Sequence, residues 1–401
     1  MNSKADIGLT FARTCQLGDL LDFRSEIVHP KDKPTGSSIF VGLEHIERDT
    51  GVRVGAEHID LSDLTGRRAR FFSGDIVYGY LRPYLNKVWI AEFDGICSVD
   101  QYVFIVRPDV DRDYIARFLR SDHFLETAPI GSSPGQLPRI RTGEIAATPI
   151  VLPSLADQRR IAAILDAADN LRRIRRRALK LLDDLVQSLF MEMFGREISL
   201  MSDRSTKMLG EIVDLQNGAY YPADLYSSTQ AGTEMVHMSD AFYGVVQRGS
   251  LRRVMATSAD VQKYGLSQSD LIIARRSLNI EGAAKPCLIP FSGEPLLYES
   301  SFVRLRPRKG TIRSPYLYHY LSLPLVRARE LARFITQSTI SGINQSNLSK
   351  VRVFVPPVAA QEEFCRAVEM VDQNRQAHAK SLEVLGHLFS SLQARAFSGR
   401  L

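Results

Sequence analysis

Two short stretches in the N-terminal part of the chain combine cationic, amide and aromatic side chains in a pattern that suits contacts with DNA. The candidates are Arg82, Tyr84, Asn86 and Lys87 in the first stretch, and Gln136, Arg139 and Arg141 in the second. Side chains of these types read base edges, and further contacts to phosphates fix the register of a protein on the duplex. Residue type therefore makes them candidates for contacts with a polyanion such as DNA. A solvated hairpin and a linker are the structural alternative.

The C-terminal part of the chain repeats the pattern with a different balance of residue types. Its candidates are Arg275, Arg276 and Asn279 after a predicted strand, and Asn344, Gln345 and Asn347 further along. Asn344 lies 203 residues after Arg141, so the second group takes the place of the earlier arginines. Asn and Gln suit bidentate contacts with adenine, whereas Arg suits guanine.

The densest charge in the chain is the arginine-rich run at residues 172–177, which is interrupted by Ile174 alone. A run of this kind on a helix is commonly a solvated face. Phosphate contacts with DNA, or docking to an acidic partner, are the functional interpretations, and all three stay open.

Motifs for catalysis or metal binding are missing from the sequence. The glycine-containing stretch at residues 131–135 lacks the Lys-Ser/Thr of a phosphate-binding loop, and neither HExxH nor an Asn-Pro-Pro-Tyr-like tetrad occurs. The four cysteines are far apart and form no metal-ligand spacing. We predict no catalytic residue, no metal and no cofactor. A carboxylate nuclease site dispersed along the chain remains the open alternative.

An internal repeat supplies the elements that must position these residues. Residues 152–158 and 355–361 both lead from a proline into a glutamine at the start of a long helix, 203 residues apart. Weaker similarities lie upstream, where Gly74-Asp75-Ile76 resembles Ser269-Asp270-Leu271. The pattern predicts a globular domain, a helix, a second globular domain and a second helix, with boundaries at 1–153, 154–195, 196–356 and 357–401.

The two helices are predicted to pack on each other as an antiparallel coiled coil. In the first helix, heptad position a holds Ile161, Ala168, Arg175, Leu182 and Leu189, and position d holds Ile164, Leu171, Ala178, Leu185 and Glu192. The second helix carries a weaker seam, and Gly195 and Gly399 are predicted to end the two helices. Packing of each helix on its own domain is the alternative.

The domains themselves are predicted to be mixed α/β. Apolar runs at residues 76–78, 88–91 and 102–106 predict strands, followed by a helix at 111–126, and residues 271–274, 301–305 and 316–329 repeat that order. The net charge of +6 is uneven: residues 1–153 hold 18 Lys and Arg against 21 Asp and Glu, whereas residues 196–356 hold 20 against 13.

Composition bears on the cellular compartment of the protein and on contact with a membrane. Of the 401 residues, 44% are hydrophobic, and no apolar run approaches the roughly 20 residues that span a bilayer. The first 16 residues mix charges with polar groups, which is not typical of a signal peptide. We expect a cytoplasmic protein in a reducing compartment, without contact to a membrane.

The chain resembles the DNA-specificity (S) subunit of type I restriction-modification systems over nearly its whole length. The resemblance rests on two variable domains, each followed by a Pro-x-x-x-x-Gln entry into a long helix, from Pro153 to Gln158 and from Pro356 to Gln361. The Gly74-Asp75-Ile76 turn and residues 81–87 also look like the target recognition domains of that family.

This resemblance implies a non-catalytic subunit in which each variable domain reads one half of a split double-stranded DNA target. The helices would hold the half-sites apart and carry the docking surface for methyltransferase subunits, which bind S-adenosylmethionine and methylate adenine. A translocating restriction subunit would join them for cleavage. The alternatives are an interaction scaffold with two α/β modules on a coiled-coil rod, and a stand-alone nuclease or methyltransferase.

Overall fold

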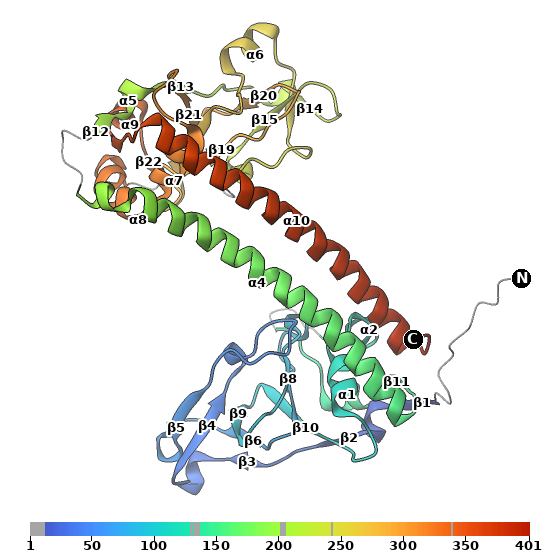
Figure 1. Cartoon of the computed structure of the whole chain (residues 1–401). Helices are drawn as coiled ribbons and strands as arrows, with labels where there is room; N and C mark the ends of the chain where they lie inside the picture. Colours follow the sequence, from blue (N-terminus) through green and yellow to red (C-terminus); the bar gives the residue numbers. More distant parts are fainter. Residues whose placement is uncertain (1–12, 129–130, 132–136, 201–205, 242–243, 338–339) are drawn as a thin grey trace, which may run out of the picture. The chain divides into compact units, whose positions relative to one another are not determined.

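The computed structural model describes residues 13–128, 131, 137–200, 206–241, 244–337 and 340–401. The chain divides into two compact units: unit 1 comprises Met1–Ala178 and His378–Leu401, and unit 2 comprises Leu179–Ala377. Each unit is mixed α/β, as the sequence predicts (Figure 1).

Unit 1 is built around a four-stranded antiparallel sheet. Its strand order is β2 (Leu21–Phe23), β10 (Gln101–Val106), β7 (Ile76–Gly79) and β8 (Val88–Ile90). Val77 on β7 pairs with Val103 and with Trp89, and all three belong to one hydrophobic cluster. Ile76 and Tyr78 belong to another cluster, because neighbouring side chains of a strand point to opposite faces. The sheet therefore carries a hydrophobic core on each face.

A second sheet and short helices complete these two cores of unit 1. The second sheet has the order β3 (Ile27–Val28), β6 (Arg68–Phe71), β9 (Gly95–Ser98), β4 (Ser37–Val41) and β5 (Glu57–Asp60). The helices are α1 (Arg112–Leu119), α2 (Asp122–Thr127) and α3 (Thr142–Ala146), and a small sheet pairs β1 (Arg13–Gln16) with β11 (Pro149–Leu152). The predicted single helix at 111–126 is broken because Ser121 caps α2, accepting the Phe124 N–H at 3.1 Å.

Unit 2 repeats this plan. Its main antiparallel sheet has the order β13 (Val213–Asn217), β21 (Phe302–Pro307), β17 (Leu271–Ala274) and β19 (Pro286–Leu288). A second sheet has the order β14 (Tyr226–Ser227), β16 (Arg253–Val254), β15 (Thr233–Val236) and β20 (Leu296–Tyr298). Two small sheets pair β12 (Thr206–Met208) with β23 (Arg352–Phe354) and β18 (Arg276–Ser277) with β22 (Ser341–Gly342).

The helices of unit 2 also follow unit 1, with one interruption. They are α5 (Leu209–Ile212), α6 (Ser258–Tyr264), α7 (Ser314–Ser322), α8 (Pro324–Val326) and α9 (Gln345–Ser349). The helix predicted near 316–329 is interrupted at Leu323, whose extended backbone precedes Pro324. This is the expected effect of a proline on the residue before it.

The predicted repeat is confirmed by identical hydrogen bonds around two buried glutamines. The Gln158 amide nitrogen donates to the Pro153 carbonyl at 2.9 Å, and its Oε1 accepts the Asp111 N–H at 2.8 Å. Gln361 donates to the Pro356 carbonyl at 2.9 Å and accepts the Arg313 N–H at 2.8 Å. Each glutamine thus ties the start of a long helix to the preceding proline and to the start of α1 or α7.

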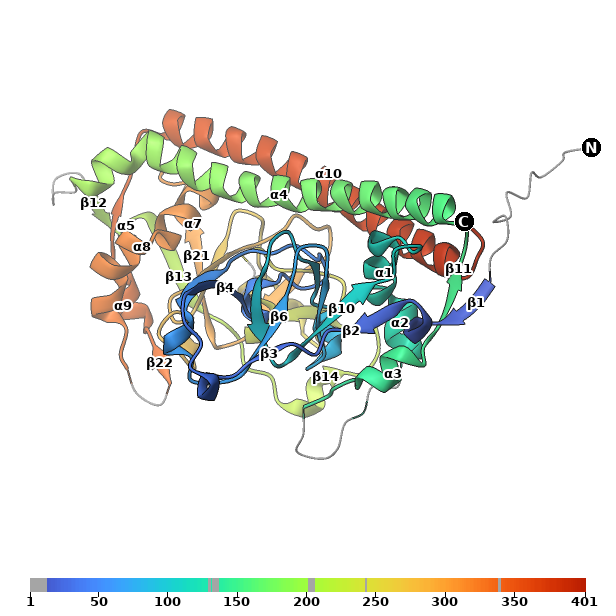
Figure 2. The ribbon, with the colours of Figure 1, turned by 90° about the horizontal axis from the view of Figure 1, so that it is seen from below.

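The long helices are α4 (Leu155–Ser199) and α10 (Val358–Phe397), and they lie side by side in Figures 1 and 2. In unit 1, the Arg172 guanidinium lies 4.4 Å from the centre of the Phe389 ring, and Arg175 contacts His378 at 2.9 Å. In unit 2, the rings of Phe190 and Phe364 are 5.1 Å apart. Unit 2 also pairs Asp183 with Arg375 at 3.7 Å. In both units the partner number on α10 therefore falls as the α4 number rises, which confirms the predicted antiparallel pairing.

The predicted seam of α4 is correct at position a and wrong at position d. Ile161 and Ala168 at position a are buried, but Leu171 and Leu185 at position d are 51% and 50% exposed. The second buried series falls one residue later, at position e, where Leu165 is fully buried. The helix therefore has a buried apolar stripe, which includes Leu165, and an exposed apolar stripe, which includes Leu171 and Leu185. The predicted heptad assigned residues of both stripes to one seam.

The predicted helix ends differ in outcome. Gly195 lies inside α4 rather than after it, because Phe194 and Ile198 pack into the core of unit 2 and carry the helix on to Ser199. Gly399, by contrast, has a φ of 73° just after α10. The Arg400 N–H donates to the Arg395 carbonyl at 2.8 Å, which is the hydrogen bond of a glycine-terminated helix end.

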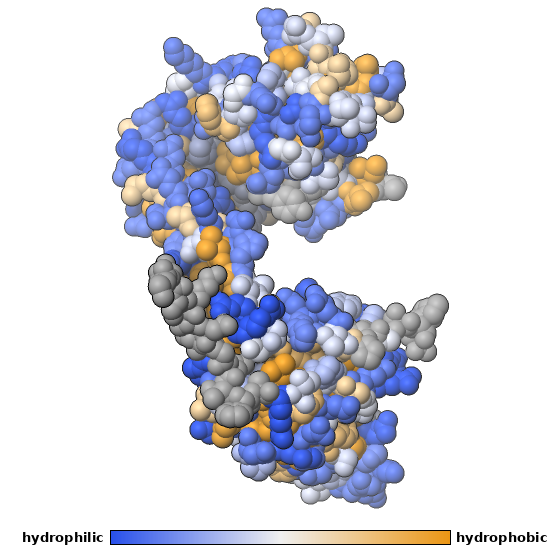
Figure 3. Space-filling model, turned by 90° about the vertical axis from the view of Figure 1, so that its right-hand side faces the viewer, coloured by the Kyte–Doolittle hydropathy of each residue, from blue (hydrophilic) through white to orange (hydrophobic). Residues whose placement is uncertain are grey.

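The exposed surface is mixed in character. The face drawn in Figure 3 is mainly hydrophilic, with hydrophobic residues in separate groups. No helix in the described part of the chain combines the length and the hydropathy that crossing a membrane requires.

Candidate nucleic-acid interface

In unit 1, the fold brings the two predicted DNA-binding stretches together. Leu81 and Arg139 form an antiparallel bridge, although they are far apart in the sequence. The Arg82 N–H donates to the Pro138 carbonyl at 2.7 Å, and the Ile140 N–H donates to the Tyr80 carbonyl at 3.3 Å. Residues 80–82 and 138–140 therefore form one paired ledge beyond the end of β7.

Unit 2 forms the equivalent ledge from residues 275–277 and 341–343. Arg276 pairs with Gly342 in the β18–β22 ladder, and the Ile343 N–H donates to the Arg275 carbonyl at 3.0 Å. Ile343 is the repeat equivalent of Ile140, so Arg275 takes the place of Tyr80, and Arg276 that of Leu81. The two ledges are the same backbone structure carrying different side chains.

Each ledge also pairs with one further residue of its own unit. Gly131 and Arg139 exchange a pair of backbone hydrogen bonds in unit 1, and Thr336 and Gly342 do so in unit 2. Gln136 belongs to the predicted DNA-binding set but lies outside the described residues.

The loop that leaves the unit 1 ledge is held in an unusual backbone conformation. Arg82 and Asn86 have φ values of 55° and 50°, in the left-handed region that non-glycine residues seldom adopt. A tight turn over Pro83–Leu85 lies between them, closed by the Leu85 N–H donating to the Arg82 carbonyl at 2.9 Å. The turn leaves Tyr84 48% exposed beside Arg82.

Several of the predicted contact residues have structural duties instead. Asn86 is buried and donates its amide N–H to the Arg120 carbonyl at 2.9 Å, and the Lys87 ammonium donates to the Leu43 carbonyl at 2.6 Å. In unit 2, the Gln345 amide donates to the Leu215 carbonyl at 2.8 Å. These three side chains hold the ledges to the domains behind them, and their contacts with DNA stay a prediction.

Two asparagines of unit 2 are engaged at one atom each. The Asn344 Oδ1 caps α9 by accepting the Asn347 N–H at 2.8 Å, and the Asn279 Oδ1 accepts the Gly282 N–H at 2.9 Å. Each Oδ1 keeps a second lone pair, and each amide nitrogen can still donate. The expected adenine contacts of these side chains stay a prediction.

The arginines of the two ledges remain available. They form no ion pair with a described residue, and all but the partly exposed Arg275 are exposed: Arg82, Arg139, Arg141, Arg275 and Arg276. Many other arginines of the same units are paired, such as Arg24 with Asp75 at 2.7 Å. The ledges thus present arginines without an ion-pair partner on backbone that is held by hydrogen bonds.

An aromatic group beside the first ledge was missed by the sequence prediction. Tyr80 and Tyr102 stack with ring centres 4.2 Å apart, and the half-exposed Phe23 meets Tyr102 edge-on at 5.6 Å. Burial raises the pKa of both tyrosines, and the charge of Arg139 opposes that rise. Only the pairing of β2 with β10 places Phe23 here, and no local pattern predicts that pairing.

The arginine run on α4 divides between inward and outward roles. Arg172 stacks on Phe389 and pairs with Asp169 at 3.4 Å, while Arg175 donates to the Nδ1 atom of His378. Arg176 and Arg177 are exposed. The run is therefore partly a packing element of the helix pair, and its outer members remain open to a partner.

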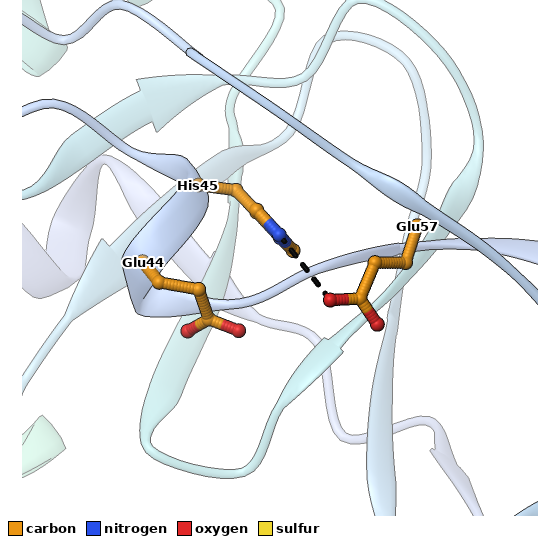
Figure 4. A group of neighbouring side chains, drawn as sticks. All are labelled: Glu44, His45 and Glu57. Carbon is orange, nitrogen blue, oxygen red and sulfur yellow. Dashed lines mark ion pairs between the residues drawn. The ribbon is translucent and has the colours of Figure 1, made fainter.

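One cluster in the described part of the chain has metal-ligand composition, namely Glu44, His45 and Glu57 (Figure 4). The His45 Nδ1 accepts the Gly42 N–H at 3.0 Å, so the neutral ring carries its proton on Nε2. That nitrogen faces Glu57 at 3.6 Å. Coordination through Nε2 would need its lone pair free and a proton on Nδ1, facing another N–H. The cluster fits a contact between two loops better than a metal site.

The family model described as the type I restriction modification DNA specificity domain matches residues 64–182 and 201–386. The two matched ranges together cover most of the chain and contain both ledges.

Curated relatives carry the same description. The chain is 31% identical over 182 residues to the type I restriction enzyme EcoDI specificity subunit of Escherichia coli, an alignment covering 44% of this chain and 40% of that protein. It is 24% identical over 325 residues to the StySPI specificity subunit of Salmonella potsdam, covering 76% and 69%. The chain thus aligns with less than half the length of the first relative.

Two solved structures share the fold. One chain, from work on complex assembly and conformational transition of the type I R-M system, matches with a TM-score of 0.60 at 22% identity over 100% of both chains. The type I restriction-modification S subunit from M. genitalium matches with a TM-score of 0.57 at 15% identity over 98% of both.

Proposed function

The chain belongs to the type I restriction modification DNA specificity family, and from that premise we propose that it reads a bipartite sequence in double-stranded DNA. Residues 1–153 act as the first target recognition domain and residues 196–356 as the second, with helical regions at 154–195 and 357–401. The observation that carries the proposal is the equivalence of the two ledges, since each domain joins its polar stretches in the same place.

The DNA contacts follow from which side chains are available. Arg82, Tyr84, Arg139 and Arg141 serve the first half-site, and Arg275 and Arg276 serve the second. Asn279, Asn344 and Asn347 contribute further hydrogen bonds, and Gln136 remains a candidate contact of the first half-site. Phosphate contacts made by arginine release counterions, so affinity falls steeply with salt.

The chain performs recognition and leaves the chemistry to its partners. Methyltransferase subunits supply S-adenosylmethionine and methylate adenine, and a translocating restriction subunit joins the complex for cleavage. The naming of relatives as specificity subunits supports this division. Such a complex works on DNA in the cytoplasm.

The long helices offer a docking surface for the methyltransferase subunits. On α4, Ile174 and Leu181 are 61% and 57% exposed and lie in one stripe with Leu171 and Leu185. The repeat places Val384 and Leu388 of α10 at the positions of Leu181 and Leu185, and both are also exposed. Exposed apolar residues at helical spacing fit a helix of a partner, and two equivalent stripes fit two copies of it.

Retention of DNA by the purified full chain with its methyltransferase partner tests the proposal. The complex is expected to retain duplex containing its target, with affinity falling by orders of magnitude between roughly 50 and 200 mM salt. The scaffold alternative, which the family does not favour, predicts stable association of the proteins with no retention of duplex at any salt concentration.

A further inference from the structure

The amide and guanidinium side chains of the two ledges differ in how far the fold engages them. Asn86 and Gln345 each donate to a backbone carbonyl of another segment, and Asn344 caps its own helix. The guanidinium groups have no such engagement, because Arg82, Arg139 and Arg276 are exposed and form no ion pair with a described residue. Arginine is therefore the residue type of the ledges with all of its donors available.

The internal repeat indicates which ledge positions face bases rather than phosphates. The sugar-phosphate backbone is chemically the same in both half-sites, whereas the bases of the two half-sites can differ. Equivalent ledge positions hold Tyr80 and Arg275, Leu81 and Arg276, and Arg139 and Gly342. Each pair differs in chemistry although the backbone hydrogen bonds are kept. Side chains that change on a constant scaffold are those expected to read a changing ligand.

We infer that both halves of the target are read through guanine, by Arg82 and Arg139 in the first domain and by Arg275 and Arg276 in the second. Guanine presents two acceptors, O6 and N7, to the major groove, and the planar fork of a guanidinium matches both. Adenine presents one acceptor and one donor, a pattern that suits an amide rather than a guanidinium. This inference rests on the proposed function and gives it a base preference.

Backbone geometry supports a reading role for Arg82. Its left-handed φ of 55° is fixed by the hydrogen bond from its N–H to Pro138 and by the turn that follows. A bidentate base contact tolerates little movement, so a reading side chain gains from a backbone that cannot shift. Strained backbone of this kind concentrates at functional sites.

Duplexes with modified guanine test the inference on the complete methyltransferase complex. The target is read from the methylation pattern of the host, and 7-deazaguanine, which lacks the N7 acceptor, replaces guanine in one half-site at a time. The complex with the unaltered chain is expected to lose roughly 10-fold in affinity for either modified half-site. The R82A/R139A variant has no donor at these positions, so it is expected to be indifferent to the first modification.

The second half-site is the matched control for that variant, because R82A/R139A retains the loss there and R275A/R276A shows the reverse pattern. The inference is overturned if a half-site contains no guanine, if 7-deazaguanine has no effect, or if the alanine variants still discriminate while duplex binding persists. Absence of any split motif and of duplex binding overturns the proposed function itself, which is a distinguishable result.

Discussion

At the residue scale, the two buried glutamines show how a single side chain joins several elements within each repeat. Gln361 satisfies both the Arg313 N–H and the Pro356 carbonyl, and it is fully buried. Gln158 does the same for Asp111 and Pro153 in unit 1. A buried backbone group without a partner is destabilising, so loss of either glutamine side chain should lower the stability of the fold.

Replacement of Gln361 by Ala is expected to lower the free energy of unfolding by roughly 2–4 kcal/mol, because two buried backbone groups lose their partner. Denaturant unfolding of the full chain measures this. The matched control is Gln373→Ala on the exposed face of the same helix, which should change stability little. Equal effects of the two substitutions would refute this stabilising role of Gln361.

His319 predicts a dependence of stability on pH in unit 2. Its ring packs against Tyr318 and Phe364, and burial lowers its pKa to about 4. The unfolded chain therefore binds a proton more readily than the folded chain between about pH 4 and 6.5, so stability falls as pH falls through that range. We expect a loss of roughly 2 kcal/mol between pH 7 and pH 5.

The variant His319→Phe keeps the aromatic packing and removes the titrating group. Comparison of its unfolding free energy with that of the unaltered chain at pH 7 and pH 5 isolates this contribution. The variant should lose roughly 2 kcal/mol less over that interval. A parallel loss in both proteins would show that His319 is not responsible.

At the element scale, sequence periodicity predicts the helices better than it predicts their packing. The strands near 76–79, 88–90 and 101–106 and both long helices lie where apolar runs place them. Position d of the α4 heptad is wrong because Leu171 and Leu185 belong to an outer stripe, which periodicity alone does not distinguish from the seam.

The site was predictable only in part, for a related reason. Composition identifies both stretches of each ledge, but the bridge between Leu81 and Arg139 depends on tertiary contacts far apart in the sequence. Which amides are engaged also depends on such contacts, as Gln345 with Leu215 shows. Residue type therefore predicts candidates, and the fold decides which of them remain available.

The polar contact between Arg175 and His378 is expected to fix the register of the helix pair. Replacing both residues with leucine should raise stability and loosen register, since a polar pair in an apolar seam specifies alignment at some expense of stability. Cysteines introduced at 172 and 389 report the native register, and cysteines at 172 and 385 report a slip of one turn. Crosslinking confined to 172–389 in the double-leucine protein would contradict this role.

If the exposed apolar stripe of α4 binds a methyltransferase subunit, a charge placed in that stripe should prevent binding. Leu181→Glu combined with Leu185→Glu should abolish co-purification of one methyltransferase subunit, because a carboxylate would have to be desolvated in the contact. Both side chains are about half exposed, so the chain itself should remain folded, as its circular dichroism would show. Lys180→Glu, also exposed on this helix, is the control, and unchanged co-purification of the double variant would exclude this docking face.

At the scale of the whole molecule, the two predicted globular domains differ in charge. Residues 1–153 carry 18 Lys and Arg against 21 Asp and Glu, while residues 196–356 carry 20 against 13. Long-range attraction to DNA therefore favours the second domain. The first domain depends more on the placed arginines of its ledge, and losing Arg82 or Arg139 should harm its half-site more than general affinity for duplex.

The methylation pattern of a host genome, mapped with and without this chain, tests the central claim most directly. A bipartite DNA-reading subunit predicts methylated adenines within a split motif of two short half-sites, and that motif vanishes when the chain is deleted. Methylation that stays unchanged after deletion, in a host whose methyltransferase partner is active, would contradict the account.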